Sequence, residues 1–415
     1  MANVAALSDQ DYDGPSMRPP LRRPRVCRGV CLALIAILAF AGLIHLALLA
    51  VTREDVAVVF FRALALSSLL SLLPLTLLWL LERRERRAPW LFAAAFLWGG
   101  CIATAFAFVF NTAFFGLVDR WVSQGPDLIW VLGPDAPMLL AAPISAPIAE
   151  ELVKALGVVV IFWILRTEHD GVRDGIVYGA LVGAGFNWFE AALYVAQGYA
   201  EYGFAPYGLQ LGARYALLGL GGHAMLTGMF GAFFGLALQT RRTWVRVLAP
   251  IFGLVLAVAA HMVNNALPLI AAIASVAAGE PPSQGEPPPD IDFLEAFWSH
   301  SLLQLILFLP FLLITVLVLW RSSIRERRAI KEELAGEATN IVSPKEYQEV
   351  LGDRILQTRR IDPMRCRASA ALVNAQHELG LRKRRVRERG NDPRSDNLAA
   401  GWREDIRRLR AFIPA

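Results

Sequence analysis

The chain has 415 residues, of which 55% are hydrophobic and 19% are charged, and its formal net charge is +5 at pH 7. Soluble globular domains are roughly 45–50% apolar and about 25% charged, so this composition excludes a protein built on one soluble core and is typical of an integral membrane protein. The positive charge is concentrated in short loops and in the C-terminal tail. It therefore predicts contact with a lipid bilayer and does not indicate a nucleic-acid-binding protein.

The predicted elements begin with residues 1–28, a polar segment rich in proline and arginine that we expect to be a disordered, basic cytoplasmic terminus. A membrane-spanning helix needs about 20 mostly apolar residues. The membrane domain, residues 29–320, contains about eight such segments: 29–51, which we interpret as an uncleaved signal anchor, 56–81, 90–117, 137–165, 175–196, 213–238, 247–276 and 299–320. The predicted fold is therefore an all-α, polytopic membrane helix bundle.

Residues 321–415 are basic and mostly polar, and they predict a soluble helical cytoplasmic tail. In "VSPKEYQEVLG", Ser343 can cap the start of a short helix and Pro344 can occupy its first turn. A second helix is predicted within 363–389, which ends in "LRKRRVRERG". This helix either lies along anionic headgroups or is a solvated charged helix.

Arginine alternates between successive loops of the membrane domain. The N-terminal tail, the loop "ERRERRAP" and the C-terminal tail are rich in arginine, whereas "TRED" contains one and the loops 197–212 and 277–298 contain none. Loops rich in lysine and arginine face the cytoplasm in membrane proteins. The pattern therefore predicts that both termini are cytoplasmic.

Four of the predicted spans carry polar residues where lipid would be expected. "APIAEELVKALG" in the fourth span contains Glu150, Glu151 and Lys154. A charge at the centre of a spanning helix costs about 2.5–3.5 kcal/mol, so such residues usually face a protein interior or a water-filled cavity. The other spans contribute Asn187 and Glu190 in the fifth, Arg214 and His223 in the sixth, and His261, Asn264 and Asn265 in the seventh.

Spacing and depth predict that these groups share one cavity. Glu150 and Glu151 lie four and three residues before Lys154, so the ammonium group can neutralise one of the carboxylates. At about 1.5 Å of rise per residue, all of these groups lie between the middle of the membrane and its outer surface. With Lys154 as the only fixed cation expected nearby, we expect one glutamate to stay protonated near pH 7 or a cation to join the site.

Each residue also has a structural interpretation. A single histidine in a span can bond a neighbouring helix, and Asn264 and Asn265 can support helix packing. Glu190 can reach the interface or pair with Arg214, which we interpret as an interface anchor. The stretches "YGALVGAGF" and "GLGGHAMLTGMFGAFFG" predict close helix packing, which does not require catalysis. The arrival of so many polar groups at one depth on successive helices nevertheless favours a functional site.

Four motifs follow one another on successive predicted spans. They are EExxK in 150–154, FxxxE in 186–190, His223 followed by "AMLTG", and HxxxN in 261–265. In this order they resemble the PrsW family of intramembrane proteases, which is related to the CAAX prenyl endopeptidase and bacteriocin-processing superfamily. The resemblance covers roughly 137–270. It departs from the family pattern at Ala191, where the family often has asparagine.

The resemblance implies an intramembrane protease of the bacterial plasma membrane. Its implied substrate is a membrane-spanning protein similar to an anti-sigma factor, cut on the extracytoplasmic side. The implied catalytic residues are Glu150, Glu151, Glu190, His223, His261 and Asn265, supported by Lys154, Phe186 and Asn187.

Two mechanisms fit these residues, and we favour the one without a metal. In that mechanism Glu150 is the general base toward water, and a histidine stabilises the oxyanion together with Asn265. In the other mechanism His223, His261 and Glu190 bind Zn²⁺ and another glutamate is the base, although the HExxH motif is absent. The alternative functions are a proton- or ion-coupled transporter and a non-catalytic membrane scaffold, both of which could use the same buried cluster.

Overall fold

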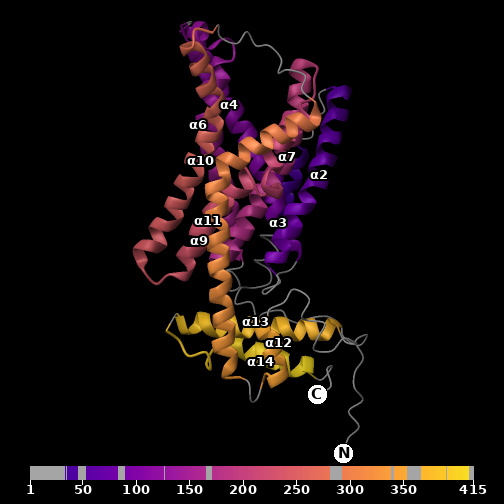
Figure 1. The fold of residues 1–415 in the computed structure, drawn as a ribbon, viewed down its shortest axis with the longest axis vertical. Coiled ribbons are helices and arrows are strands. Elements are labelled where there is room, and N and C mark those ends of the chain that lie inside the picture. The colour runs from indigo at the N-terminus through magenta and orange to yellow at the C-terminus, as the bar shows by residue number, and fades with distance from the viewer. Residues whose placement is uncertain are drawn as a thin grey trace, which may run out of the picture. The chain divides into compact units, whose positions relative to one another are not determined.

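The computed structural model describes residues 33, 35–44, 53–82, 89–125, 127–164, 171–280, 292–337, 341–352, 366–388 and 390–410. All regular structure in these ranges is helical, as the sequence predicted (Figure 1). The chain forms two compact units, one made of Arg28–Trp79 and Ala88–Val316 and the other mainly of Leu317–Ala415. The N-terminal tail and the loop 281–291 lie outside the described residues, as does most of the predicted first span, of which Ile35–Ile44 is helical.

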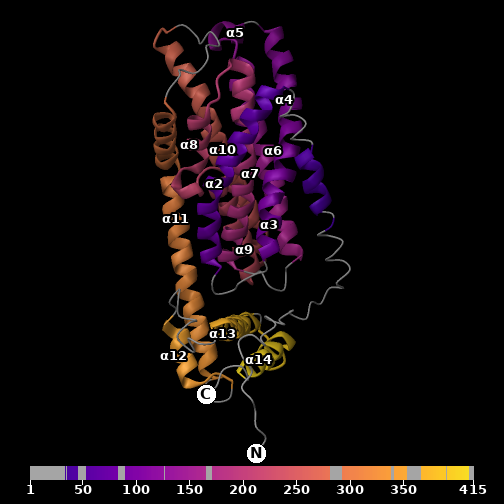
Figure 2. The same cartoon turned by 90° about the vertical axis from the view of Figure 1, so that its right-hand side faces the viewer.

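The first unit is a bundle of long helices (Figures 1 and 2). Its elements are α2 (Glu54–Leu81), α3 (Pro89–Leu97), the π-helix η1 (Trp98–Ala103), α4 (Thr104–Gln124), α5 (Asp127–Leu132), α6 (Ala136–Ile164), α7 (Val172–Tyr202), α8 (Tyr207–Tyr215), η2 (Leu217–Gly219), α9 (His223–Gln239), α10 (Thr243–Ala277) and α11 (Phe293–Ala335). In the described part of the chain, 5 helices are long and apolar enough to cross a membrane: Glu54–Leu81, Pro89–Gln124, Val172–Tyr202, Thr243–Ala277 and Phe293–Ala335. The chain is therefore an integral membrane protein.

The predicted sixth span, 213–238, is not one continuous helix, and this prediction was wrong. Helix α8 ends at Tyr215 and α9 begins at His223. Between them the backbone φ angles of Leu218, Gly219 and Gly222 are 61°, 78° and 53°. These values are incompatible with a right-handed helix, and glycine adopts them at little steric cost. His223 is consequently the first residue of a helix and does not lie within one.

Helix α7 lies at the centre of the bundle and meets α9 through backbone contacts. A Cβ atom added at Gly175 would lie 1.9 Å from the carbonyl oxygen of Gly231, and one at Gly183 would lie 2.1 Å from that of His223. These separations are far below van der Waals contact, so only glycine permits this approach. The close packing predicted from the glycine-rich stretches is thus confirmed, and it holds the start of α9 against α7.

We expect Gly183→Ala to destabilise the bundle by about 1–3 kcal/mol, because the added methyl group overlaps the backbone of His223. Gly116→Ala in α4 is the matched control, since a Cβ atom there meets nothing within 4 Å. The free energy of unfolding of both purified variants measures the difference. Equal values would show that α9 does not depend on this contact with α7.

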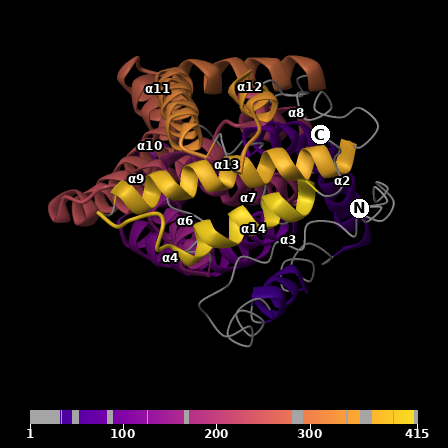
Figure 3. The ribbon, with the colours of Figure 1, turned by 90° about the horizontal axis from the view of Figure 1, so that it is seen from below.

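The second unit is formed by the C-terminal part of α11 with α12 (Pro344–Gly352), α13 (Cys366–Glu388) and α14 (Asn397–Arg410). Figure 3 shows α13 and α14 side by side. Their core contains Leu334, Leu372, Leu379 and Ile406, each 0% exposed. The apolar face of α13 therefore lies inside this core, where it is not available to a lipid surface.

The N-terminus of α12 is capped as the sequence predicted. The backbone N–H of Glu346 donates to Ser343 Oγ at 3.2 Å, and the N–H of Ser343 donates to Glu346 Oε2 at 3.0 Å. This reciprocal pair is a capping box, in which two otherwise unpaired donors are satisfied.

Candidate active site

Two glutamates of α6 hold the ammonium group of Lys154 between them. Glu150, Glu151 and Lys154 are 2%, 1% and 0% exposed. Lys154 Nζ donates to Glu150 Oε2 at 3.2 Å and to Glu151 Oε1 at 2.8 Å. It also lies 3.8 Å from the centroid of the Phe186 ring. The fully buried ammonium group is thus stabilised by two carboxylates and an aromatic face.

His223 reaches this group because α9 begins there. Its Nδ1 lies 2.8 Å from Lys154 Nζ, and its Nε2 lies 2.9 Å from Glu190 Oε2. Lysine can only donate in such a bond and a carboxylate can only accept. Both contacts are therefore satisfied by an imidazole ring that carries its proton on Nε2 and turns the lone pair of Nδ1 toward Lys154.

Asn187 supports the break between α8 and α9. Its Nδ2 donates to the carbonyl oxygens of Arg214 at 3.3 Å and Gly221 at 3.2 Å. The carbonyl groups at a helix end or in a non-helical turn have no helical partner, so an amide side chain can satisfy them. Asn187 thereby fixes the segment that brings His223 into the site.

His261 of α10 completes the cluster from the other side of Glu151. Its Nδ1 lies 3.2 Å from Glu151 Oε1, and its ring centroid lies 4.9 Å from that of His223. The second oxygen of Glu151 accepts a bond from Thr227 Oγ1 at 3.3 Å. Glu151 is therefore held by Lys154, His261 and Thr227, each from a different helix.

Glu190 of α7 pairs with Arg214. The guanidinium Nε of Arg214 donates to Glu190 Oε2 at 3.0 Å, and its Nη1 donates to Gln210 Oε1 at 2.6 Å. The pairing of Glu190 with Arg214, one of the structural interpretations that the sequence allowed, is therefore confirmed. The cluster contains a second fixed cation, so the excess negative charge is smaller than the sequence suggested. That one glutamate is protonated, or that a cation joins the site, stays a prediction.

The structure brings most of the predicted site residues into one cluster: Glu150, Glu151, Lys154, Phe186, Glu190, His223 and His261. Asn265 lies beside it and bonds the backbone of α6, since its Nδ2 donates to the carbonyl oxygen of Ala142 at 3.3 Å. Asn264 donates to Asn265 Oδ1 at 3.1 Å and accepts from Gln304 of α11 at 3.0 Å. These amides link α6, α10 and α11 around the cluster.

Asn111 of α4 is a site residue that the sequence analysis missed. Its Nδ2 donates to Glu150 Oε1 at 3.2 Å, while its Oδ1 accepts from Ser145 Oγ at 2.7 Å. The signal available in the sequence was a single amide within an otherwise apolar span. Through these bonds Asn111 fixes the plane of the Glu150 carboxylate.

A cavity of about 200 Å³ lies between α4, α6 and α7 beside the cluster. Its polar wall includes Asn111, Glu150 and Glu190, and its apolar wall includes Phe108, Phe115, Met138 and Leu193. Glu150 therefore belongs both to the buried cluster and to the cavity, whereas Glu151 is not among the residues that line it. Of the two glutamates of α6, only Glu150 faces a group that enters the cavity.

The donor set of the cluster fits a transition-metal ion. Glu150, Glu151, His223 and His261 each offer one ligand atom, and among the described residues these atoms lie within 4.8 Å of one another. Imidazole nitrogen and carboxylate oxygen are the common non-thiolate ligands of zinc. Glu190, a ligand in the alternative zinc mechanism, lies outside this group, where it accepts from Arg214 Nε and contacts His223 Nε2.

Comparison with known proteins agrees with this geometry. Residues 87–281 match the model of the family described as PrsW family intramembrane metalloprotease. The chain is 34% identical over 114 residues to Protease PrsW of Geobacillus kaustophilus (strain HTA426), in an alignment that covers 26% of this chain and 46% of that protein. The chain thus spans less than half the length of this curated relative, and no solved structure matches it significantly. All four motifs lie within the matched residues, and the resemblance of this chain to PrsW-type intramembrane proteases is confirmed.

Proposed function

We propose that this protein is a membrane-embedded peptidase that hydrolyses a membrane-anchored protein at the Glu150–Glu151–His223–His261 cluster. The observation that carries the proposal is the position of Glu150, which lies in the cluster and in the wall of the cavity at once. The match of residues 87–281 to the PrsW family supports the same reaction class.

In the proposed mechanism Glu150 is the general base. Asn111 and Lys154 bind its two carboxylate oxygens and hold it against the cavity, where it removes a proton from the water that attacks the scissile carbonyl. Asn111 also lines the cavity, and the second hydrogen of its amide group is proposed to donate to the oxyanion, while Lys154 stays buried behind Glu150. Glu151 keeps Lys154 and His261 in place behind the cavity.

A divalent ion would be held by Glu150, Glu151, His223 and His261. When bound, such an ion supplies Lewis-acid polarisation of a carbonyl group and lowers the pKa of a coordinated water molecule. Lys154 Nζ contacts three of these four side chains, so an ion in the cluster requires the ammonium group to shift away from them. Glu150 would then be a ligand, and a different carboxylate would have to act as the base.

We further propose that the substrate is a membrane-spanning protein similar to an anti-sigma factor, cut near the outer membrane surface. The arginine alternation supports cytoplasmic termini, and with that orientation the motif residues lie in the outer halves of their helices. The setting would be a bacterial plasma membrane, as the resemblance implies. Helices α7 and α9 meet through glycine backbone contacts at Gly175 and Gly231, which leaves no room for a polar path between these two helices.

The experiment is cleavage of a panel of single-span reporter proteins by the full-length chain in proteoliposomes. We expect cleavage by the wild type and about a 10²-fold or larger loss in His261→Ala, since this side chain bonds Glu151 and offers a ligand atom. A parallel set of cleavage reactions contains the chelator 1,10-phenanthroline, and Zn²⁺ is then added back. These reactions test whether cleavage requires a metal ion. Loss with the chelator and recovery with Zn²⁺ would favour the metal mechanism. Unchanged cleavage would favour the metal-free one, and cleavage that survives His261→Ala would contradict the proposed site.

A further inference from the structure

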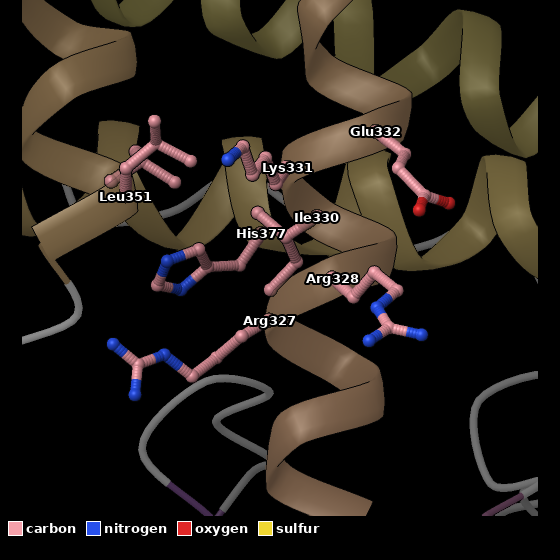
Figure 4. Close-up of a pocket in the computed structure, with 8 residues that line it drawn as sticks. Arg327, Arg328, Ile330, Lys331, Glu332, Leu351 and His377 are labelled. Carbon is pink, nitrogen blue, oxygen red and sulfur yellow. The ribbon is translucent and has the colours of Figure 1, made fainter.

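A second cavity lies in the C-terminal unit, far along the sequence from the motifs. It has a volume of about 450 Å³ and is lined by residues of α11, α12 and α13, among them Arg327, Lys331, Leu351 and His377. Figure 4 shows the side chains of Arg327, Lys331 and His377 on one side of α11, while Arg328 and Glu332 extend on the other. Three nitrogen-bearing side chains therefore share the same side of the cavity.

Two acidic residues of this part of α11, Glu332 and Glu333, are engaged by cations of α13. Glu332 Oε2 lies 3.0 Å from Arg384 Nη1, and Glu333 Oε2 lies 3.1 Å from Arg387 Nε. In the described part of the chain, no carboxylate forms an ion pair with Lys331. Lys331 thus brings to the cavity a positive charge that no carboxylate of the described residues neutralises, and this favours an anionic ligand.

The apolar part of the cavity and its place on α11 point to a lipid. Ile330, Val350 and Leu351 supply apolar wall beside the cationic groups. On the same continuous helix, Trp320 is 59% exposed and Ile324 is 40% exposed, as expected of side chains that face lipid. Arg327 follows Trp320 by about 10 Å along the helix axis. The headgroup layer extends about 5–7 Å beyond the hydrocarbon core, and a long arginine or lysine side chain spans the difference.

We propose that this cavity binds the phosphate group of an anionic phospholipid in the adjacent leaflet. Arg327 and Lys331 contact the phosphate, His377 donates from the imidazole ring, and the apolar wall receives the glycerol end of the acyl chains. The same phosphate chemistry could be met by a soluble phosphate compound. This proposal goes beyond the protease function and does not depend on it.

The test is native mass spectrometry of the full-length protein after incubation with equal amounts of phosphatidylglycerol and phosphatidylcholine. Arg327→Gln/Lys331→Gln removes the proposed contacts. Arg325→Gln/Lys345→Gln is the control, because it makes the same change in net charge at exposed positions that do not line the cavity. We expect the wild type and the control to retain phosphatidylglycerol preferentially. In the cavity variant, the ratio of retained phosphatidylglycerol to phosphatidylcholine should fall at least about fivefold.

Leu351→Trp fills the apolar wall without changing the charge, and it should also lower retention even if the double variant folds poorly. A titration with inorganic phosphate at constant ionic strength, with thermal unfolding as the readout, distinguishes a lipid phosphate from a soluble phosphate compound as the ligand. Phosphate could stabilise the wild type while the protein retains both lipids equally. That result would support a phosphate site but would overturn the proposal that a lipid occupies it. Equal retention of phosphatidylglycerol by the cavity variant and the control would overturn the proposal.

Discussion

Replacing Glu150 by glutamine should lower the rate of substrate cleavage by about 10²–10⁴-fold and leave the fold intact. Glutamine keeps the shape of the side chain and can still accept a bond from Lys154, but it cannot take a proton from water. The measurement is the single-turnover cleavage rate of a reporter protein in proteoliposomes. The free energy of unfolding of the same samples checks that the variant is folded.

Glu201→Gln is the matched control for this variant. Glu201 lies near the end of α7, is exposed and lies outside the cluster and the cavity wall. Its replacement removes the same charge and should leave the rate unchanged. If Glu150→Gln cleaves as fast as Glu201→Gln, the base is another group and the assignment of Glu150 fails.

Replacing Lys154 by methionine should destabilise the membrane unit by about 3–5 kcal/mol, the usual cost of removing one partner from a buried ion pair. The side chain is 0% exposed, and its loss leaves Glu150 and Glu151 facing each other without the cation between them. The free energy of unfolding in mixed micelles measures this effect. Lys345→Met, at an exposed position on α12, should change it by less than about 0.5 kcal/mol.

The double variant Lys154→Met/Glu151→Gln tests the electrostatic cause. It removes the ammonium group together with the carboxylate that lies 2.8 Å away, so it should be more stable than Lys154→Met alone. A double variant that is less stable than Lys154→Met would show that Lys154 acts through packing, for example against Phe186, and not as a counter-ion.

The cluster could be predicted because helical spacing is a local property. Glu150, Glu151 and Lys154 share one face of α6, and His261 and Asn265 share one face of α10, whatever the rest of the chain does. Because ionisable side chains within a membrane face the protein interior and not the lipid, these faces are predicted to meet. The positions of α6, α7 and α10 follow from the same reasoning, and their observed ends differ from the predicted ones by one to six residues.

The break before α9 could not be predicted in this way. Gly219, Gly221 and Gly222 lie in an apolar stretch and are compatible with close helix packing as well as with left-handed backbone angles. The two alternatives differ only in tertiary contacts, such as the bonds from Asn187 to Arg214 and Gly221. Asn111 was missed for a related reason, since its role depends on the approach of α4 to α6.

The most direct test of the central claim is the mass of the fragments released from one spanning reporter in sealed proteoliposomes. The account predicts that the wild type produces two fragments whose masses place the cut near the outer membrane surface, and that Glu150→Gln produces neither. A cut on the cytoplasmic side of the reporter's span, or the same fragments from Glu150→Gln, would contradict it.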